Sequence, residues 1–345
     1  MNIYFLFSSI TFLQLYIPLV IQYNILNYKC IFILRNNYKK YACPYSKVNY
    51  NILLNYQKIY KFKIINNKNI NLKNINTIVI MVDGDIYGHP RLIGLRESLL
   101  KKLNKNSMKI SLIEHMNYKW TYNHYISDIN YIIFPNKHFA DQFKFYSKKN
   151  LYLGNTKFDN IPNNDILLKK YNLQNNTKKC VILFPKLKFK SLISGNLLLK
   201  LYFYLKTLNY FIIVKTRPKD NEIPIYLQGD LLVCSDIYPN ESIELMKISD
   251  LCILFSSSAI DETLFSEIPC IDIELDNSIK RNNFIKNEKI YKIINNFDNL
   301  SLNKFNIIIN SLEKKKSIIY KELKEKYLFN HNNSSKKIID FINKI

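Results

Sequence analysis

The chain has 345 residues, of which 48% are hydrophobic, so it is long enough for two folded domains and its composition excludes a mainly disordered protein. Its formal net charge of +23 at pH 7 predicts a surface that attracts anions. Because the lysines are scattered and no recognised nucleic-acid motif occurs, we expect phosphorylated ligands or an anionic membrane surface as partners, and no nucleic acid.

The amino-terminal residues predict a strand over 3–8, a helix over 11–23 and a second strand over 29–34. The nearly uncharged stretch 3–21 also fits a signal sequence or membrane anchor, which is the alternative interpretation. No Lys or Arg precedes this stretch, and several polar residues and a proline interrupt it, so we favour the strand and helix.

Apolar runs of strand length then alternate with helical runs, after a Tyr- and Asn-rich stretch that gives no clear pattern up to about residue 76. The predicted strands are 77–82, 109–113, 131–134 and 151–153, and the predicted helices are 90–103 and 137–146. This alternation predicts a parallel, doubly wound sheet. The polar, proline-containing stretch 160–165 is typical of a domain boundary.

The same alternation starts again after the boundary. Further strands are predicted at 180–184, 210–214, 231–234, 251–255 and 270–273, and helices at 193–208, at 242–248 and around Glu262. The pattern is helical from residue 299 onward, with helices at 312–327 and 336–345. We therefore expect an α/β protein with a Rossmann-like domain at 1–159, a second at 160–298 and carboxyl-terminal helices at 299–345.

The six cysteines lie mostly inside these apolar runs, and no two of them have C-x-x-C spacing. We interpret them as buried free thiols of a protein in a reducing cytoplasm, with zinc binding or disulfides as the alternatives. The cysteines are Cys30, Cys43, Cys180, Cys234, Cys252 and Cys270.

Three serines, Ser256, Ser257 and Ser258, separate the strand 251–255 from the helical run that carries Glu262. Hydroxyls and backbone N–H groups at such a turn can bind a phosphate. The Glu262 carboxylate can accept hydrogen bonds from both hydroxyls of a ribose. A compatible alternative is that Ser257 or Ser258 only caps the helix, whose dipole favours an acid in its first turn.

Lysine and arginine side chains follow two other strands of the second domain. Lys215 and Arg217 alternate after the strand 210–214, which puts both cations on one side of the chain, and Lys186 follows the strand 180–184. Ligands of doubly wound sheets bind at the carboxyl ends of the strands, so these cations are candidates for binding phosphate. The alternative is that they are ordinary solvated turns.

Acids and a histidine follow the strands 77–82 and 109–113 in the first domain: Asp83, Asp85 and His115. A carboxylate or imidazole here could remove a proton from an acceptor hydroxyl, and we prefer His115 as that base because the strand 109–113 ends at Glu114-His115. The alternative is that each is a hydrogen-bonded loop residue. No zinc-protease, P-loop or dinucleotide-binding motif occurs, so we expect no metal and no cofactor.

Three segments of the sequence resemble GT-B proteins. Residues 154–159 (GNTKFD) resemble the segment between the domains of Kdo transferases and UDP-N-acetylglucosamine 2-epimerases. Residues 215–218 (KTRP) resemble a turn of CDP-glycerol glycerophosphotransferases and capsular polysaccharide transferases, and residues 249–273 resemble their nucleotide-binding segment. The resemblance covers roughly residues 109–273 in order and spacing.

The resemblance implies a GT-B-like fold in which Ser257, Ser258 and Glu262 bind a nucleotide, with Lys215 and Arg217 near its phosphates. It implies a cytoplasmic transferase, at the inner face of a membrane, that moves a sugar or glycerophosphate to a surface-glycan or lipid-linked acceptor. The donor would be a nucleotide-sugar or a CDP-alcohol. The alternatives are a UDP-N-acetylglucosamine 2-epimerase and, because Met116 replaces the glycine of a His-Gly pair, a non-catalytic binding protein.

Overall fold

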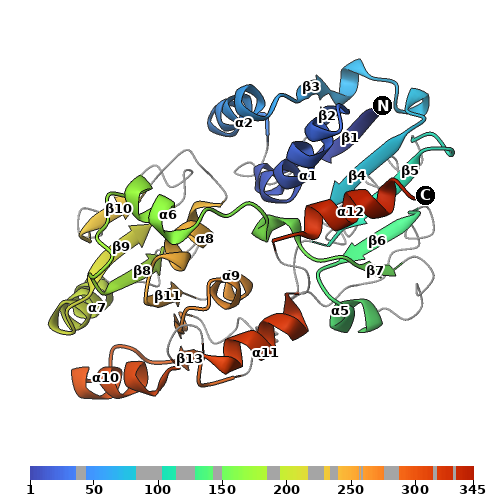
Figure 1. Cartoon of the computed structure of the whole chain (residues 1–345). Coiled ribbons are helices and arrows are strands. Elements are labelled where there is room, and N and C mark those ends of the chain that lie inside the picture. The colour runs from blue at the N-terminus through green and yellow to red at the C-terminus, as the bar shows by residue number, and fades with distance from the viewer. Residues whose placement is uncertain are drawn as a thin grey trace. The chain divides into compact units, whose positions relative to one another are not determined.

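The computed structural model describes residues 1–35, 44–82, 103–113, 129–142, 150–184, 195–216, 229–233, 240–255, 257, 259–275, 287–313, 317–328 and 332–345. The chain forms two compact units (Figure 1). Unit 1 contains Met1–Asn160 together with Glu325–Ile345, and unit 2 contains Ile161–Lys324. The last residues of the chain therefore return to the unit in which the chain begins.

Unit 1 is built on a seven-stranded sheet in which every neighbouring pair of strands is parallel. The strands are β1 (Asn2–Phe7), β2 (Lys29–Leu34), β3 (Lys63–Asn66), β4 (Ile78–Val82), β5 (Met108–Leu112), β6 (Tyr131–Phe134) and β7 (Asn150–Tyr152). Their order is β3-β2-β1-β4-β5-β6-β7. The helices are α1 (Leu13–Ile25), α2 (Lys47–Tyr60), α5 (Lys137–Gln142) and α12 (Ser334–Ile342), with short 3₁₀ turns η1 (Ile10–Phe12), η3 (Asn67–Asn69), η4 (Leu72–Asn74) and η8 (Thr156–Phe158).

The amino terminus forms the first strand–helix–strand unit of this sheet, as predicted. The buried hydroxyl of Tyr16 on α1 donates to the backbone oxygen of Leu6 on β1 at 2.8 Å, and its ring lies 5.0 Å from that of Phe5. Burial of these aromatic residues against the sheet explains why an uncharged sequence folds here as part of a core. Among the described helices, none is long and apolar enough to cross a membrane.

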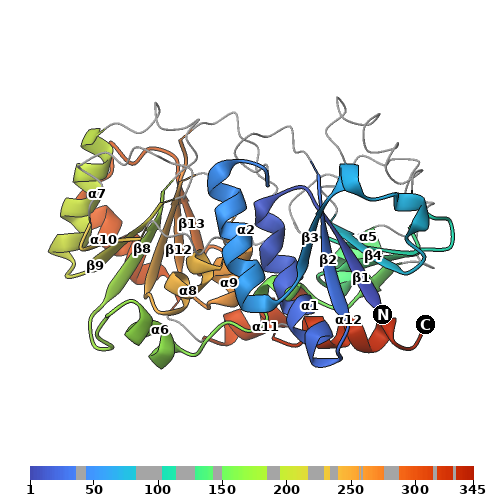
Figure 2. The ribbon, with the colours of Figure 1, turned by 90° about the horizontal axis from the view of Figure 1, so that it is seen from above.

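Unit 2 is built on a six-stranded parallel sheet of order β10-β9-β8-β11-β12-β13. Its strands are β8 (Lys179–Leu183), β9 (Phe211–Lys215), β10 (Leu231–Val233), β11 (Leu251–Phe255), β12 (Cys270–Ile273) and β13 (Tyr291–Ile294). Its helices are α6 (Asn164–Lys170), α7 (Gly195–Thr207), α8 (Glu241–Lys247), α9 (Ile260–Phe265) and α10 (Leu302–Ser311), and α11 (Ile318–Tyr327) crosses the boundary to unit 1. Figure 2 shows α7 and α10 on one face of this sheet and α8 and α9 on the other.

The predicted α/β class with two doubly wound parallel sheets and carboxyl-terminal helices is confirmed. The helix predicted over 312–327 is partly wrong, because Leu312 is extended (φ −77°, ψ 140°) and ends α10, and the next helix begins at Ile318. The predicted helix 90–103 lies outside the described residues apart from its last residue. Among the helices and strands in the part of the chain that the structure describes, α2, β3, α6 and β13 were not predicted.

The cysteines that the structure describes are free and buried, as predicted: Cys30, Cys180, Cys252 and Cys270. Cys43 and Cys234 lie outside the described residues.

The GNTKFD segment forms hydrogen bonds with α1 and with the start of α12 in unit 1. Gly154 has φ 101°, a conformation that favours glycine. The Thr156 hydroxyl donates to the backbone oxygen of Leu15 on α1 at 2.7 Å. The buried Asp159 carboxylate accepts from the backbone N–H groups of Ser334 (3.1 Å) and Ser335 (2.6 Å), at the start of α12. This segment therefore fastens the carboxyl-terminal helix to unit 1.

Candidate functional site

The strand order of unit 2 creates a switch point between β8 and β11, which are hydrogen-bonded neighbours. The chain leaves β8 toward β9 on one side, and it leaves β11 toward β12 on the other. Ligands of such sheets bind outside the carboxyl ends of the strands at the point where the winding reverses. The residues after β8, β9 and β11 are therefore the natural place to look for a site.

Four residues separate β11 from the short helix α9, and the structure describes Ser257 and Ala259 of these four. All five residues of β11 are buried, which fixes the strand in the sheet, and Ser257 follows two residues after its end. The Ser257 hydroxyl oxygen accepts from the backbone N–H of Ala259 at 3.3 Å. Ala259 is the N-cap residue of α9, and no side-chain hydrogen bond caps the helix there. Ser257 therefore does not cap α9, and its hydroxyl oxygen instead accepts from the backbone N–H of the residue just before the helix.

Glu262 lies in the first turn of α9 and is half-buried. Its helix is fixed by neighbours on either side: Ile260 and Leu264 are each 1% exposed. The Thr263 hydroxyl donates back to the Ile260 oxygen at 2.8 Å, so it is engaged within the helix. Glu262 therefore belongs to a helical turn whose neighbouring apolar residues are buried, close to the switch point.

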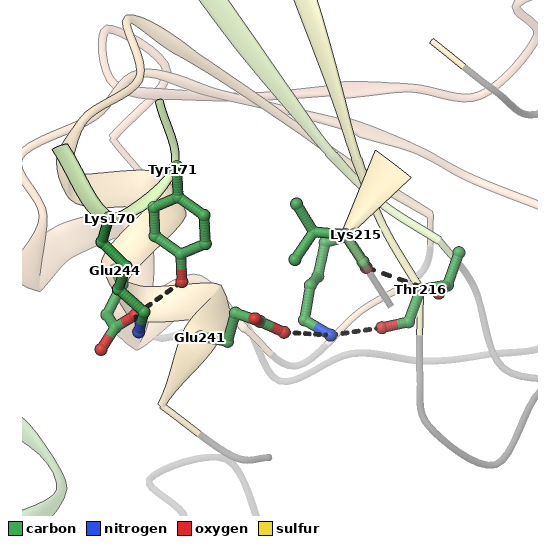
Figure 3. Close-up of polar contacts among 7 residues, drawn as sticks. Lys170, Tyr171, Lys215, Thr216, Glu241 and Glu244 are labelled. Atoms are coloured by element: carbon green, nitrogen blue, oxygen red, sulfur yellow. Dashed lines mark hydrogen bonds and ion pairs between the residues drawn. The ribbon is translucent and has the colours of Figure 1, made fainter. Parts of the chain in front are cut away.

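Lys215 ends β9, the strand next to β8, and forms a buried ion pair. Its ammonium nitrogen lies 2.9 Å from Oε2 of Glu241, the first residue of α8 (Figure 3), and the two side chains are only 8% and 2% exposed. The same ammonium donates to the backbone oxygen of Thr216 at 2.5 Å. The Thr216 N–H donates to the Val233 oxygen of β10 at 3.0 Å, which fixes the strand end.

A second acid of α8 has partners of a different kind. Glu244, one turn after Glu241, accepts from the Tyr171 hydroxyl at 2.6 Å and pairs with Lys170 (Figure 3). Burial, followed by the hydrogen bond to Glu244, holds the pKa of Tyr171 above its ordinary value. These partners lie at the end of α6, so Glu244 connects α8 to α6, whereas Glu241 connects it to the end of β9.

The first-domain candidates lie on two neighbouring strands. β4 and β5 are paired in parallel, with Val82 opposite Leu112, so the chain segments that carry Asp83, Asp85 and His115 leave from adjacent strand ends. Those three residues are outside the described part of the chain, as are Ser258, Lys186 and Arg217 of the second domain. Of the predicted site residues, the structure therefore describes Lys215, Ser257 and Glu262.

Sequence reasoning missed Glu241. An acid in the first turn of a helix is expected from the helix dipole alone, so nothing in the local sequence separates it from an ordinary helix start. Its partner Lys215 is 26 residues earlier in the chain, and only the sheet order brings the two together. Within the described residues, no group of three or more His, Cys, Asp or Glu side chains could hold a metal ion.

No protein-family model matches the sequence, and no curated protein matches it. Solved structures do match over almost the whole chain. The UDP-GlcNAc 2-epimerase from Neisseria meningitidis bound to UDP-GlcNAc has a TM-score of 0.61 and 13% identity, covering 100% of both chains. A variant of the wall teichoic acid polymerase TagF with CDPG has a TM-score of 0.59 and 16% identity, covering 100% of this chain and 88% of that one.

A third structure, the glycotransferase of kitacinnamycin, has a TM-score of 0.58 and 8% identity, and the match covers 99% of this chain and 98% of that chain. At these identities the matches show the fold alone. The chain has the GT-B fold, with two Rossmann-like sheets and carboxyl-terminal helices.

Proposed function

We propose that this chain is a nucleotide-dependent transferase that moves a glycosyl or glycerophosphoryl group to a surface-glycan or lipid-linked acceptor. One observation supports it most: Lys215 ends β9, and Ser257 and Glu262 follow β11, at or next to the switch point of unit 2. Cationic, hydroxyl and carboxylate groups at that edge are what a nucleotide with a phosphate and a ribose diol requires.

In this proposal each described side chain has one task. The Glu262 carboxylate accepts hydrogen bonds from the ribose hydroxyls, and the Ser257 hydroxyl donates to a phosphate oxygen. The Lys215 ammonium attracts the phosphates from the end of β9. Lys186, Arg217 and Ser258 follow β8, β9 and β11 in the sequence and would add further cations and a hydroxyl. The domain 160–298 binds the donor, and the domain 1–159 binds the acceptor.

The transfer itself joins an acceptor oxygen to the donor. For a sugar, that oxygen attacks the anomeric carbon, the bond from this carbon to the diphosphate breaks, and a nucleoside diphosphate leaves. For glycerophosphate, it attacks the outer phosphorus, the P–O–P bond breaks, and CMP leaves. The acceptor proton passes to a base, for which we propose His115, with Asp85 and Asp83 as further candidates.

A lipid-linked acceptor would lie at a membrane. With a formal net charge of +23, the chain would be attracted to anionic lipid, so a peripheral position on the cytoplasmic face fits a lipid-linked acceptor. The second candidate function is a UDP-N-acetylglucosamine 2-epimerase, which the full-length match to an epimerase favours. It would use the same nucleotide site without an acceptor. A non-catalytic nucleotide-binding protein is the third candidate.

Calorimetric titration of the full chain with UDP, CDP and CMP conjugates tests the nucleotide site. We expect one nucleotide to bind in the micromolar range, and no binding of any would contradict both enzyme proposals. Incubation with UDP-N-acetylglucosamine alone then separates the two, because only an epimerase converts it without an acceptor. Conversion under these conditions would replace the transferase proposal by the epimerase.

A further inference from the structure

Lys215 is a buried cation at the carboxyl end of β9, where we propose that a phosphate binds, and it is already paired with the buried carboxylate of Glu241. Neighbours of Lys215 on β9, Ile212 and Val214, pack in the hydrophobic cluster with α7, and Lys215 alternates to the face that carries α8. There its ammonium donates to the Thr216 oxygen and forms an ion pair with Glu241. An ammonium has three N–H groups, so it has the capacity to bind a phosphate in addition to the two partners described for it.

A buried ion pair of this kind contributes little to stability, because the two charges lose hydration that their attraction only partly offsets. A pair of apolar side chains would fill the same space at no electrostatic cost. Glu244 on the same helix is an acid whose described partners, Tyr171 and Lys170, only connect α8 to the end of α6. Glu241 differs because its partner is the cation at the end of β9, beside the switch point.

We propose that Glu241 is a built-in counter-anion that competes with the nucleotide's phosphate for Lys215 and thereby lowers nucleotide affinity. This inference rests on the proposed nucleotide site. A phosphate that approaches Lys215 also approaches the Glu241 carboxylate, and like charges repel most strongly where water is excluded. Weaker binding favours product release. A transferase must release the spent nucleotide after each reaction, and a buried lysine without a counter-anion would bind its phosphate too tightly.

The sign of the effect distinguishes this role from a structural one. Glu241→Gln keeps an oxygen that accepts from the Lys215 ammonium but removes the negative charge. We therefore expect the variant to bind a nucleoside diphosphate about tenfold more tightly, a factor that corresponds to about 1.4 kcal/mol. A residue that only supports the fold would weaken binding when it is changed. The matching nucleoside, which has no phosphate, should bind the variant and the wild type equally.

The experiment is calorimetric titration of UDP, CDP, uridine and cytidine into four full-length proteins: wild type, Glu241→Gln, Glu244→Gln and the double variant Lys215→Met/Glu241→Leu. The double variant removes both charges and leaves neither one buried alone, so it keeps the test possible if the single variant is unstable. We expect tighter diphosphate binding in Glu241→Gln, no change in Glu244→Gln, and binding in the double variant that is at least about tenfold weaker than in Glu241→Gln.

Three results would overturn the inference while leaving the nucleotide site intact: unchanged or weaker diphosphate binding in Glu241→Gln, an equal gain for the nucleoside, or equal affinity in the double variant and Glu241→Gln. If Glu241→Gln does not fold, a double variant that binds the diphosphate more tightly than wild type overturns it, because Lys215 would then not attract the phosphate, and equal or weaker binding supports it. If none of UDP, CDP and the CMP conjugates binds the wild type, the proposed function itself fails.

Discussion

Two buried acids, one in each unit, show how differently a carboxylate can be used. Asp159 in unit 1 accepts from two backbone N–H groups at the start of α12, and it is 2% exposed. Glu241 in unit 2 is equally buried, but its partner is the long side chain of Lys215 at a strand end. Backbone donors cannot leave without unfolding the helix, whereas a lysine ammonium can exchange one anion for another.

The difference indicates which acids belong to the scaffold and which belong to a ligand site. A carboxylate bonded to backbone should affect stability when it is changed and leave ligand affinity unaltered. A carboxylate paired with a side-chain cation at the switch point should do the reverse. The predictions that follow test this division, beginning with the largest expected effect.

Asp159→Ala should produce the largest loss of stability. Two buried N–H groups at the start of α12 lose their acceptor, and each unsatisfied buried donor costs about 1–3 kcal/mol, so we expect a loss of about 3 kcal/mol. Urea denaturation followed by circular dichroism measures it. Asp165→Ala, at an exposed position of α6, is the matched control. A loss below that of the control would remove Asp159 from the scaffold.

Glu244→Gln tests whether any buried acid that is paired with a side chain affects nucleotide affinity. The variant loses the charge-assisted bonds to Tyr171 and Lys170, and we expect it to lose about 1–2 kcal/mol of stability. Its nucleotide affinity should equal that of the wild type, because these partners are at the end of α6. If nucleotide affinity changed as much as in Glu241→Gln, the location of an acid near the switch point would not determine its effect on binding.

Tyr171 provides a pH test of the same pair. Its pKa is raised in the folded protein by burial and by Glu244, so its contribution to stability is complete below the unfolded-state pKa of about 10 and is lost as the pH rises above it. Tyr171→Phe should therefore reduce the loss of stability between about pH 9.5 and 11. Urea midpoints across this range measure it. Identical slopes for variant and wild type would contradict the assignment.

Ser257→Ala should have the smallest effect, and on affinity rather than stability. The hydroxyl lies in the turn after β11, and loss of one hydrogen bond to a phosphate should weaken nucleotide binding by about two- to tenfold. Ser311→Ala, at the exposed end of α10, is the control. Equal affinity in Ser257→Ala and the control would exclude the serine hydroxyl from the site.

Much of the fold follows from the sequence because buried parallel strands are apolar runs of the right length. The runs 131–134, 251–255 and 270–273 coincide with β6, β11 and β12. The missed elements lack that signal. In β3, Lys63–Asn66, every residue is at least partly exposed, and α2 hides its apolar face among asparagines and tyrosines. Such elements are specified by their place in the finished sheet.

The site was predictable only in part for a related reason. Ser257 and Glu262 lie within seven residues after β11, so their place at the carboxyl edge could be predicted from the local pattern. The pairing of Lys215 with Glu241 depends on the strand order, which no short segment encodes. The role of Asp159 also escaped prediction, because its partners Ser334 and Ser335 are at the other end of the chain.

Calorimetric titration of Glu262→Ala with UDP and CDP tests the central claim, that a nucleotide binds at the carboxyl edge of unit 2. The control is Glu288→Ala, which removes an exposed acid just before β13, at the opposite edge of the sheet. We predict at least about tenfold weaker binding for Glu262→Ala, because a ribose diol loses a charged acceptor, and wild-type affinity for the control. Equal affinity in both variants would contradict the claim.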